Sequence, residues 1–96
     1  MWQRSANAEH AFGMANLAWS YYNGVGTAID LAAAADWYRR AGEAGHLESL
    51  YNLGLMYADG IGVPQDKEAA IEILNSVADA GLPDAKQALA KLSANH

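Results

Sequence analysis

The sequence repeats itself with a period of 36 residues, and this repeat limits the possible folds more than any other feature. Residues 14–49 align with residues 50–85 without a gap. The ten identical pairs are Asn16/Asn52, Leu17/Leu53, Tyr21/Tyr57, Gly24/Gly60, Gly26/Gly62, Asp30/Asp66, Ala33/Ala69, Ala34/Ala70, Ala44/Ala80 and Gly45/Gly81. Self-similarity of this period is typical of a solenoid, in which each unit buries its apolar face against its neighbours.

The first helix of each unit is predicted by the spacing of its apolar residues. They recur at i, i+3, i+4 and i+7 over residues 11–22 and again over 47–58, which indicates a helix with one buried stripe. The stripe residues are Met14, Leu17, Ala18 and Tyr21 in the first unit and Leu50, Leu53, Gly54 and Tyr57 in the second. The small residues Ala18 and Gly54 allow a neighbouring helix to approach closely.

A glycine-containing turn and a second helix complete each unit. Asn-Gly-Val-Gly and Asp-Gly-Ile-Gly break the first helices, because glycine adopts positive φ at little cost. Asp30 and Asp66 are expected to cap second helices over residues 31–43 and 67–79 by accepting hydrogen bonds from free backbone amides. The residues expected to end these helices are Gly45 and Gly81.

The chain, residues 1–96, is therefore predicted to form one all-α solenoid domain. Residues 14–49 and 50–85 are the two full units. Residues 1–13 correspond to a partial repeat that opens within the second helix of a preceding unit. Residues 83–94 correspond to a C-terminal capping helix, which carries polar residues on the formerly apolar stripe. The N-terminal end lacks such a cap, so we expect either an upstream repeat or a second copy of the chain to cover it.

Composition and charge exclude several classes of function. Hydrophobic residues make up 52% and charged residues 18%, which favours a folded chain over a disordered one. A net charge of -5 with six Lys and Arg argues against nucleic-acid binding. The lack of cysteine excludes disulfides, thiol catalysis and cysteine-ligated metals. With no stretch long enough to span a membrane and no signal-peptide pattern, we expect a soluble protein and favour the cytoplasm.

The order of residues within each unit resembles the Sel-one-like repeats (SLR), which are related to tetratricopeptide repeats. The first unit carries this pattern as Leu17, Tyr21, Gly24, Gly26, Asp30, Ala34, Trp37, Tyr38, Ala41 and Gly45, and the second as Leu53, Gly54, Tyr57, Gly60, Gly62, Val63, Asp66, Ala70, Gly81 and Ala85. The chain departs from the pattern at Thr27, Gly42 and Ile73-Leu74 without a change in spacing. The resemblance implies a right-handed α-α superhelix that binds proteins or peptides as an adaptor or scaffold, without catalytic activity and without a cofactor.

Three features could instead indicate catalysis or ligand binding. His10 and His46 precede the first helices and His96 ends the chain, but no clustered ligands accompany them, so we interpret the first two as helix-entry residues. Residues 24–26 and 60–62 follow helices rather than strands and lack the Lys-Ser/Thr pair of a phosphate loop. The carboxylates near the inter-repeat turns are interpreted as supports of helix ends rather than as a hydrolase pair. The sequence thus predicts no catalytic residue and no metal site.

The candidate binding surface is the side of the first helices that does not face the predicted core. Its residues are Asn16, Trp19, Ser20, Asn23, Asn52, Leu55, Met56 and Asp59, continued by Lys91 and Asn95 on the last helix. An asparagine amide can both donate to and accept from a peptide backbone, and Trp19, Leu55 and Met56 would form an exposed apolar patch. The alternative assigns the asparagines to solvent or to hydrogen bonds within the repeat. Trp37 and Tyr38 are interpreted first as packing between repeats.

We therefore expect an adaptor or scaffold module that binds a protein or peptide on its concave face. Two alternatives stay open: a structural or self-associating segment of a larger repeat protein, which could form a homodimer through its N-terminal end, and a small hydrolase. An adaptor requires exposed apolar area on the inner face, whereas self-association requires it at the N-terminal end. A hydrolase requires clustered, strongly perturbed ionisable groups in a cleft. The sequence identifies neither the partner nor its pathway.

Overall fold

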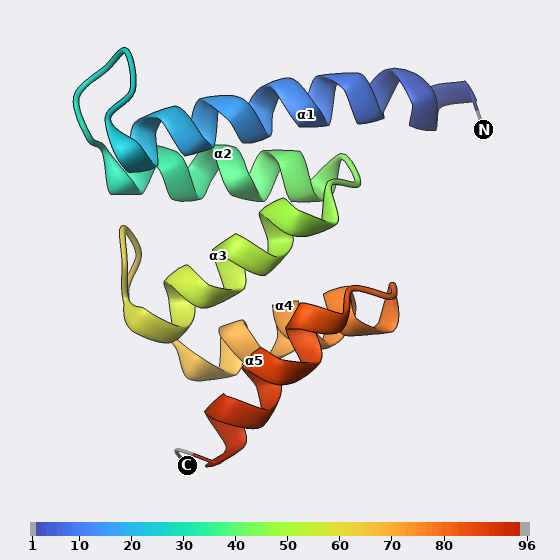
Figure 1. The fold of residues 1–96 in the computed structure, drawn as a ribbon, viewed down its shortest axis with the longest axis vertical. Coiled ribbons are helices and arrows are strands. Elements are labelled where there is room, and N and C mark those ends of the chain that lie inside the picture. Colours follow the sequence, from blue (N-terminus) through green and yellow to red (C-terminus); the bar gives the residue numbers. More distant parts are fainter. Residues whose placement is uncertain (1, 95–96) are drawn as a thin grey trace.

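Five helices stacked in chain order make up the described part of the chain. A computed structural model describes residues 2–94, with side chains for residues 10–92. The helices are α1 (Trp2–Asn23), α2 (Leu31–Glu43), α3 (Leu47–Asp59), α4 (Lys67–Asp79) and α5 (Pro83–Ala94). α1 packs against α2 and α3 packs against α4, and α5 follows at the far end of the stack (Figure 1). The architecture is the predicted all-α solenoid of helix pairs.

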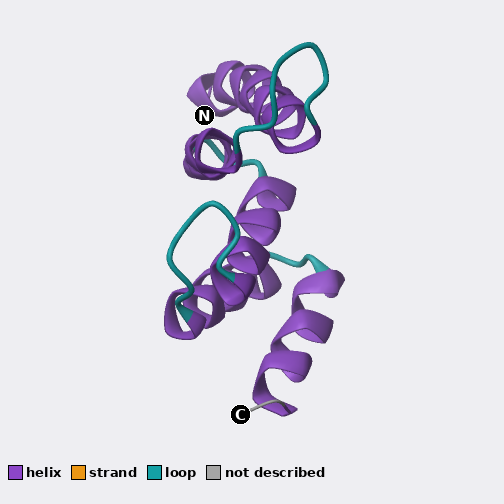
Figure 2. Cartoon of the chain, turned by 90° about the vertical axis from the view of Figure 1, so that its left-hand side faces the viewer, coloured by secondary structure: helices purple, strands orange, loops and turns teal. Residues whose placement is uncertain are grey.

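The helix pairs are rotated with respect to one another along the stack. Both glycine-containing turns lie on the same side of the molecule in Figure 1. In the perpendicular view, α2 is seen end-on whereas α5 is strongly inclined to it (Figure 2). The rotation brings the first helix of each unit, α1, α3 and α5, onto a shared surface, which is the surface where the candidate site lies.

Side-chain caps fix where the second helices and α3 begin. Asp30 and Asp66 each accept a hydrogen bond, at 3.0 Å, from the backbone amide three residues later. His46 caps α3: its Nδ1 accepts from the Ser49 amide at 3.2 Å and lies 2.7 Å from the Ser49 Oγ. Both predicted aspartate caps are confirmed, α2 and α4 span the predicted residues, and His46 is a helix-entry residue as interpreted.

The first helix is longer than predicted. The sequence predicts a helix from residue 11 preceded by the end of a separate helix, whereas α1 is one unbroken helix of 22 residues. The difference arises at Glu9, which corresponds to Gly45 and Gly81 by the 36-residue period. These two glycines follow α2 and α4 and adopt φ of 108° and 111°. A left-handed backbone costs a non-glycine residue about 1–2 kcal/mol. The chain therefore continues as a helix through Glu9.

The core consists largely of alanine, which lets the helices approach closely. Ala18, Ala34, Ala41 and Ala70 are fully buried. One cluster lies at the junction of the two units and contains Ala18, Ala34, Ala35, Tyr38, Leu53 and Met56. A second cluster joins α4 to α5 and contains Leu74, Val77, Ala85 and Ala88. The apolar contacts are thus spread along the stack rather than gathered in one deep centre.

The apolar stripe of α1 is buried only in part, contrary to the prediction. Leu17 is 43% exposed, whereas its counterpart Leu53 is 3% exposed. Leu53 packs against α2 of the preceding unit, in the cluster that contains Ala34 and Ala35. In the described chain no unit precedes α1, so the equivalent side of Leu17 faces solvent. Equivalent positions of the repeat therefore have different environments at the end and in the middle of the stack.

A close backbone contact at Gly62 joins the second unit to the first. Gly62 has φ of 73°, and a Cβ at this position would overlap the carbonyl group of Leu31, the first residue of α2. Its counterpart Gly26 has a similar φ of 77°, but no heavy atom of the described structure lies within 4 Å of the same Cβ position. The two glycines thus share a backbone requirement, while only Gly62 also requires the absence of a side chain.

We predict that Gly62→Ala destabilises the chain more than Gly26→Ala. Both substitutions place alanine at positive φ, which costs about 1 kcal/mol, and Gly62→Ala adds a clash with the Leu31 carbonyl that must separate the two units. The expected additional loss in the free energy of unfolding is about 1–3 kcal/mol. Urea denaturation, monitored by circular dichroism, measures the free energy of unfolding of both variants. Equal losses in the two variants would show that the Gly62 contact does not hold the units together.

Candidate peptide-binding groove

A groove runs along the facing sides of α1 and α3. It consists of two adjoining cavities of about 370 Å³ and 340 Å³, which meet at Trp19, Tyr38 and Asn52. We call the two together the inner groove. Its other lining residues are Tyr22, Asn23, Leu55, Met56, Asp59 and Ile61 in the first cavity and Phe12, Ala15, Asn16, His46, Glu48, Tyr51, Leu82 and Asp84 in the second.

The walls of the inner groove come from equivalent positions of the two repeats. α1 and α3 contribute the pairs Phe12/Glu48, Asn16/Asn52, Trp19/Leu55 and Asn23/Asp59, each separated by the 36-residue period. The first members of this series line the second cavity and the last members line the first cavity. The groove therefore follows both helices along their length, and α1 and α3 run in the same direction beside it.

Tyr38 of α2 forms the floor between the two walls. It is only 6% exposed and belongs to the core cluster at the junction of the units, which confirms its interpretation as a packing residue, yet it also lines both cavities. Burial raises the pKa of the Tyr38 phenol above its ordinary value of 10.0, the adjacent Tyr22 raises it further, and a hydrogen bond with Asn52 opposes both effects. The floor of the groove is thus uncharged at neutral pH, and it lines both cavities together with Asn52 of the α3 wall.

Seven of the eight predicted binding residues line the inner groove. They are Asn16, Trp19, Asn23, Asn52, Leu55, Met56 and Asp59. The prediction for Ser20 is wrong, because it lines neither cavity; its carbonyl oxygen, near the end of α1, accepts from the amides of Gly24 and Val25. Lys91 lines a third cavity of about 390 Å³ between α3 and α5. Asn95 and His96 lie outside the described residues.

The predicted exposure of Met56 is wrong. Met56 touches the inner groove but is 2% exposed and packs in the core cluster with Ala34 and Ala35 of α2. Met56 directly follows Leu55 on α3, and its side chain lies between α3 and α2 rather than over the groove. The apolar surface that a ligand meets is therefore formed by Trp19, which is 53% exposed, and the half-buried Leu55.

One of the three asparagines makes a hydrogen bond within its own helix. The Asn23 amide donates to the Trp19 carbonyl oxygen at 3.0 Å, which supports the last turn of α1. Asn52 lies beside the Tyr38 phenol, where both line the two cavities, and lowers its pKa. The structural alternative for the asparagines therefore applies to Asn23. An amide has two donor hydrogens and an acceptor oxygen, so one such bond leaves polar capacity for a ligand.

Several groove residues were missed by the sequence analysis. They are Phe12, Ala15, Tyr22, Tyr38, His46, Glu48, Tyr51, Ile61, Leu82 and Asp84. Phe12 and Glu48 lie one helical turn before Asn16 and Asn52, so the same helical spacing could have identified them. Tyr38, in contrast, belongs to a second helix and reaches the groove only because α2 packs beneath α1 and α3. Phe12 also contacts His46 edge to face, with ring centroids 6.3 Å apart.

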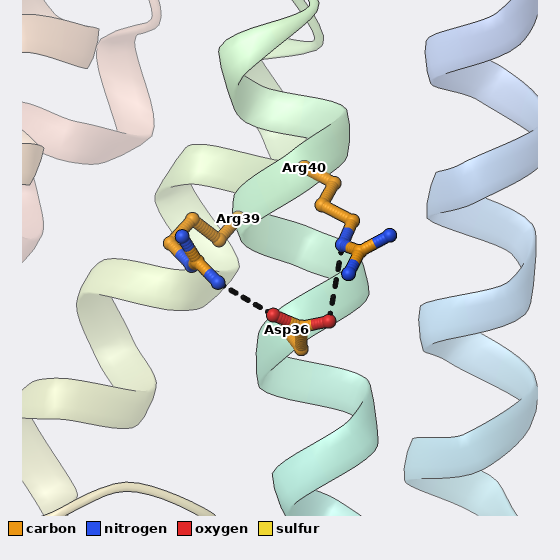
Figure 3. A network of polar contacts seen from close by, with 3 residues as sticks. All are labelled: Asp36, Arg39 and Arg40. Atoms are coloured by element: carbon orange, nitrogen blue, oxygen red, sulfur yellow. Dashed lines mark hydrogen bonds and ion pairs between the residues drawn. The ribbon is translucent and has the colours of Figure 1, made fainter.

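The inner groove is acidic. Glu48, Asp59 and Asp84 line it, and none of its described lining residues is Lys or Arg. Two cations of α2 lie elsewhere: Arg39 and Arg40 bind the two oxygens of Asp36 at 2.6 Å and 3.1 Å (Figure 3). Arg40 also lies over the ring of Trp37, 5.1 Å from its centroid. The negative charge of the groove is therefore not neutralised by α2.

The described residues bring together no group of three or more His, Asp or Glu side chains placed to hold a metal ion. Among the described helices, none is both long enough and apolar enough to cross a lipid bilayer.

The comparison with protein families identifies the repeat. The model of the Sel1 repeat matches residues 11–46 and 47–82. The chain belongs to the Sel1 repeat family. These two segments have the predicted period of 36 residues and begin three residues before the unit boundaries drawn from the sequence alone. The Sel1 repeat is a non-catalytic repeat fold that generally serves as a protein-interaction or scaffold module.

Solved structures show the same fold. The chain is similar to a Sel1 repeat protein from Oxalobacter formigenes (36% identity, TM-score 0.81). The match covers 84% of the present chain and 61% of the Oxalobacter protein. It is also similar to cysteine rich protein B of Helicobacter pylori (26% identity, TM-score 0.78), in a match that covers 82% of the present chain and 59% of the Helicobacter protein. A third similar structure is a protective antigen of uropathogenic Escherichia coli with an SLR fold (42% identity, TM-score 0.79). That match covers 91% of the present chain and 19% of the antigen. The chain thus spans less than two thirds of each of these proteins, and no curated protein matches it in sequence.

We predict that Tyr38 makes the stability of the chain fall at alkaline pH. Because its pKa is raised in the folded state, the phenol ionises first in the unfolded chain as the pH passes 10.0, and the free energy of unfolding then decreases. Tyr38→Phe should retain more of its stability between pH 9 and pH 11 than the parent chain, as measured by urea denaturation at each pH. Tyr57→Phe is the control for the loss of a phenol outside the groove. Parallel pH profiles for all three chains would contradict the prediction.

Proposed function

We propose that the chain is an adaptor module that binds a segment of a partner protein along the inner groove, and that it is not an enzyme. The observation that carries this proposal is the exposed indole of Trp19 at the centre of the groove, where the two cavities meet above Tyr38 and beside Asn52. Large aromatic side chains in hollows are the residues that most often dominate the energy of protein interfaces. The module would act by holding its partner.

The shape of the groove favours an extended segment of a partner. Its lining residues on α3 run from Glu48 to Asp59, a separation of 11 positions, which corresponds to roughly 16 Å along a helix. An extended peptide spans this length with about five residues. The groove is open along its side, so a chain that continues beyond both ends can lie in it. A small substrate, in contrast, would stay largely exposed to water.

We predict that Trp19→Ala removes peptide binding with little loss of stability. Trp19 is half exposed, so truncation leaves no buried cavity, while a ligand that covers the indole loses about 2 kcal/mol or more of binding free energy. The measurement is the enrichment of peptides from a random phage-displayed library on the immobilised chain, followed by fluorescence anisotropy of the enriched peptides. Asn75→Ala, which truncates an exposed side chain of α4 outside the groove, is the control.

Failure of the library to enrich any peptide on the parent chain would contradict the adaptor proposal. A second contradictory result would be a large fall in the melting temperature of Trp19→Ala with unchanged peptide affinity, because Trp19 would then be a structural residue.

A second candidate function is self-association through the N-terminal face. We define this face by Leu17, Val25 and Ile29, which are all exposed. In the second unit, the equivalent Leu53 and Ile61 pack against the core at the junction of the units. The N-terminal face therefore has the chemistry of a surface that is covered wherever a unit precedes it. We propose that a second copy of the chain covers it in solution.

We predict that Leu17→Lys shifts the chain toward the monomer. A charge on the N-terminal face would have to be desolvated in a dimer, whereas in the monomer it is hydrated because Leu17 is 43% exposed. Sedimentation velocity over a range of protein concentrations measures the change. Ala90→Lys, which adds the same charge at an exposed position of α5, is the control. A parent chain that stays monomeric at the highest concentration would exclude this second function and leave the adaptor proposal untouched.

A further inference from the structure

We propose that the ligand of the inner groove is a basic peptide, with two Lys or Arg residues four or six positions apart. This inference rests on the proposed adaptor function and adds the chemistry of the partner. It follows from three properties of the groove: carboxylates at both ends, aromatic rings between them, and a length that sets the spacing of the charges.

The carboxylates lie at the two ends of the inner groove. Asp59 lines the first cavity, and Glu48 and Asp84 line the second. Among the described ion pairs within 4.0 Å, one involves these carboxylates: the His46 Nε2 is 4.0 Å from Glu48 Oε1. Lys91 of α5 lies outside the groove but lines the third cavity together with Asp59. With a net charge of -5, the chain attracts cations and repels anions, and the carboxylates direct that attraction to the groove.

Aromatic rings lie between the two acidic ends. Trp19 and Tyr38 line both cavities, while Tyr22 belongs to the first and Tyr51 to the second. The face of an aromatic ring attracts an ammonium or guanidinium group, and the aliphatic part of a Lys or Arg side chain packs against the same ring. The protein itself contains one such contact, in which Arg40 lies over Trp37. A basic side chain in the groove can therefore use a ring and a carboxylate together.

The spacing of the two basic residues follows from the length of the groove. Glu48 and Asp59 are 11 positions apart on α3, which is roughly 16 Å at the helical rise. An extended peptide advances about 3.3 Å per residue. Side chains an even number of positions apart point to the same face of an extended peptide. Two basic side chains four or six positions apart thus meet the two acidic ends at the same time, whereas adjacent basic residues meet only one end.

The test uses three labelled peptides of serine and glycine with one central leucine. The first carries two lysines six positions apart, the second carries two glutamates at the same places, and the third carries two adjacent lysines. Fluorescence anisotropy gives the affinity of each for the parent chain. We expect the spaced-lysine peptide to bind tightest, the adjacent-lysine peptide roughly fivefold more weakly and the glutamate peptide weakest. The affinity of the first should fall as sodium chloride is raised, because salt screens exposed charges.

Two isosteric variants assign the effect to the groove. Asp59→Asn and Glu48→Gln each remove one negative charge from one end, and each should weaken the spaced-lysine peptide roughly fivefold. Glu72→Gln removes the same charge from an exposed position of α4 outside the groove and should leave the affinity unchanged. Melting temperatures of the three variants show whether they remain folded.

The outcomes separate this inference from the proposed function. Equal affinity for the lysine and glutamate peptides, or an equal loss in Glu72→Gln and Asp59→Asn, would overturn the inference. If the enriched library peptides still lose affinity in Trp19→Ala, the adaptor function stands even though its ligand is not basic. If Trp19→Ala binds every peptide as the parent chain does, both the inference and the adaptor function fail.

Discussion

The close approach between the two units at Gly62 is the contact on which the rest of the structure depends. Where the turn of the second unit meets the start of α2, the backbones lie so near that a Cβ on Gly62 would overlap the Leu31 carbonyl. This approach lets Leu53 reach the alanines of α2, so that α3 packs against α2. A larger residue at Gly62 would increase the distance between the units and open the core cluster. Alanine serves the same end along the helices, since it allows close packing and has a high helix propensity.

The candidate site is a consequence of this packing rather than a separate element. Tyr38 belongs to the core cluster and also forms the floor of the inner groove, where it lines both cavities together with Asn52 of the wall supplied by the second unit. The groove therefore exists only while the two units hold their relative position. Stability at the junction and the shape of the binding surface are set by the same contacts, as expected for a solenoid whose units contact only their neighbours.

The features of the fold that depend on local chemistry could be predicted from the sequence. The aspartate caps and the glycines that follow the helices act within a few residues, so they located α2 and α4. The continuity of α1 was missed because the repeat was extended to Glu9, a residue that does not favour the backbone of Gly45. Met56 and Tyr38 depend on how α2 packs against α3, which helical spacing alone does not describe. Helical spacing gave the face of each first helix, while tertiary packing decided which side chains on it remain exposed.

Differences between the repeats, rather than the repeat itself, give the inner groove its chemical character. Asn16 and Asn52 are identical, but Trp19 of α1 corresponds to Leu55 of α3, and Asn23 corresponds to Asp59. A strictly repeated surface would offer the same contacts to a ligand in either register along the stack. Unequal walls place the indole on one helix and the carboxylates mainly on the other, so they favour one register and one direction of a bound chain. The repeated positions keep the helices in place, and the positions that differ between units are free to determine which partner binds.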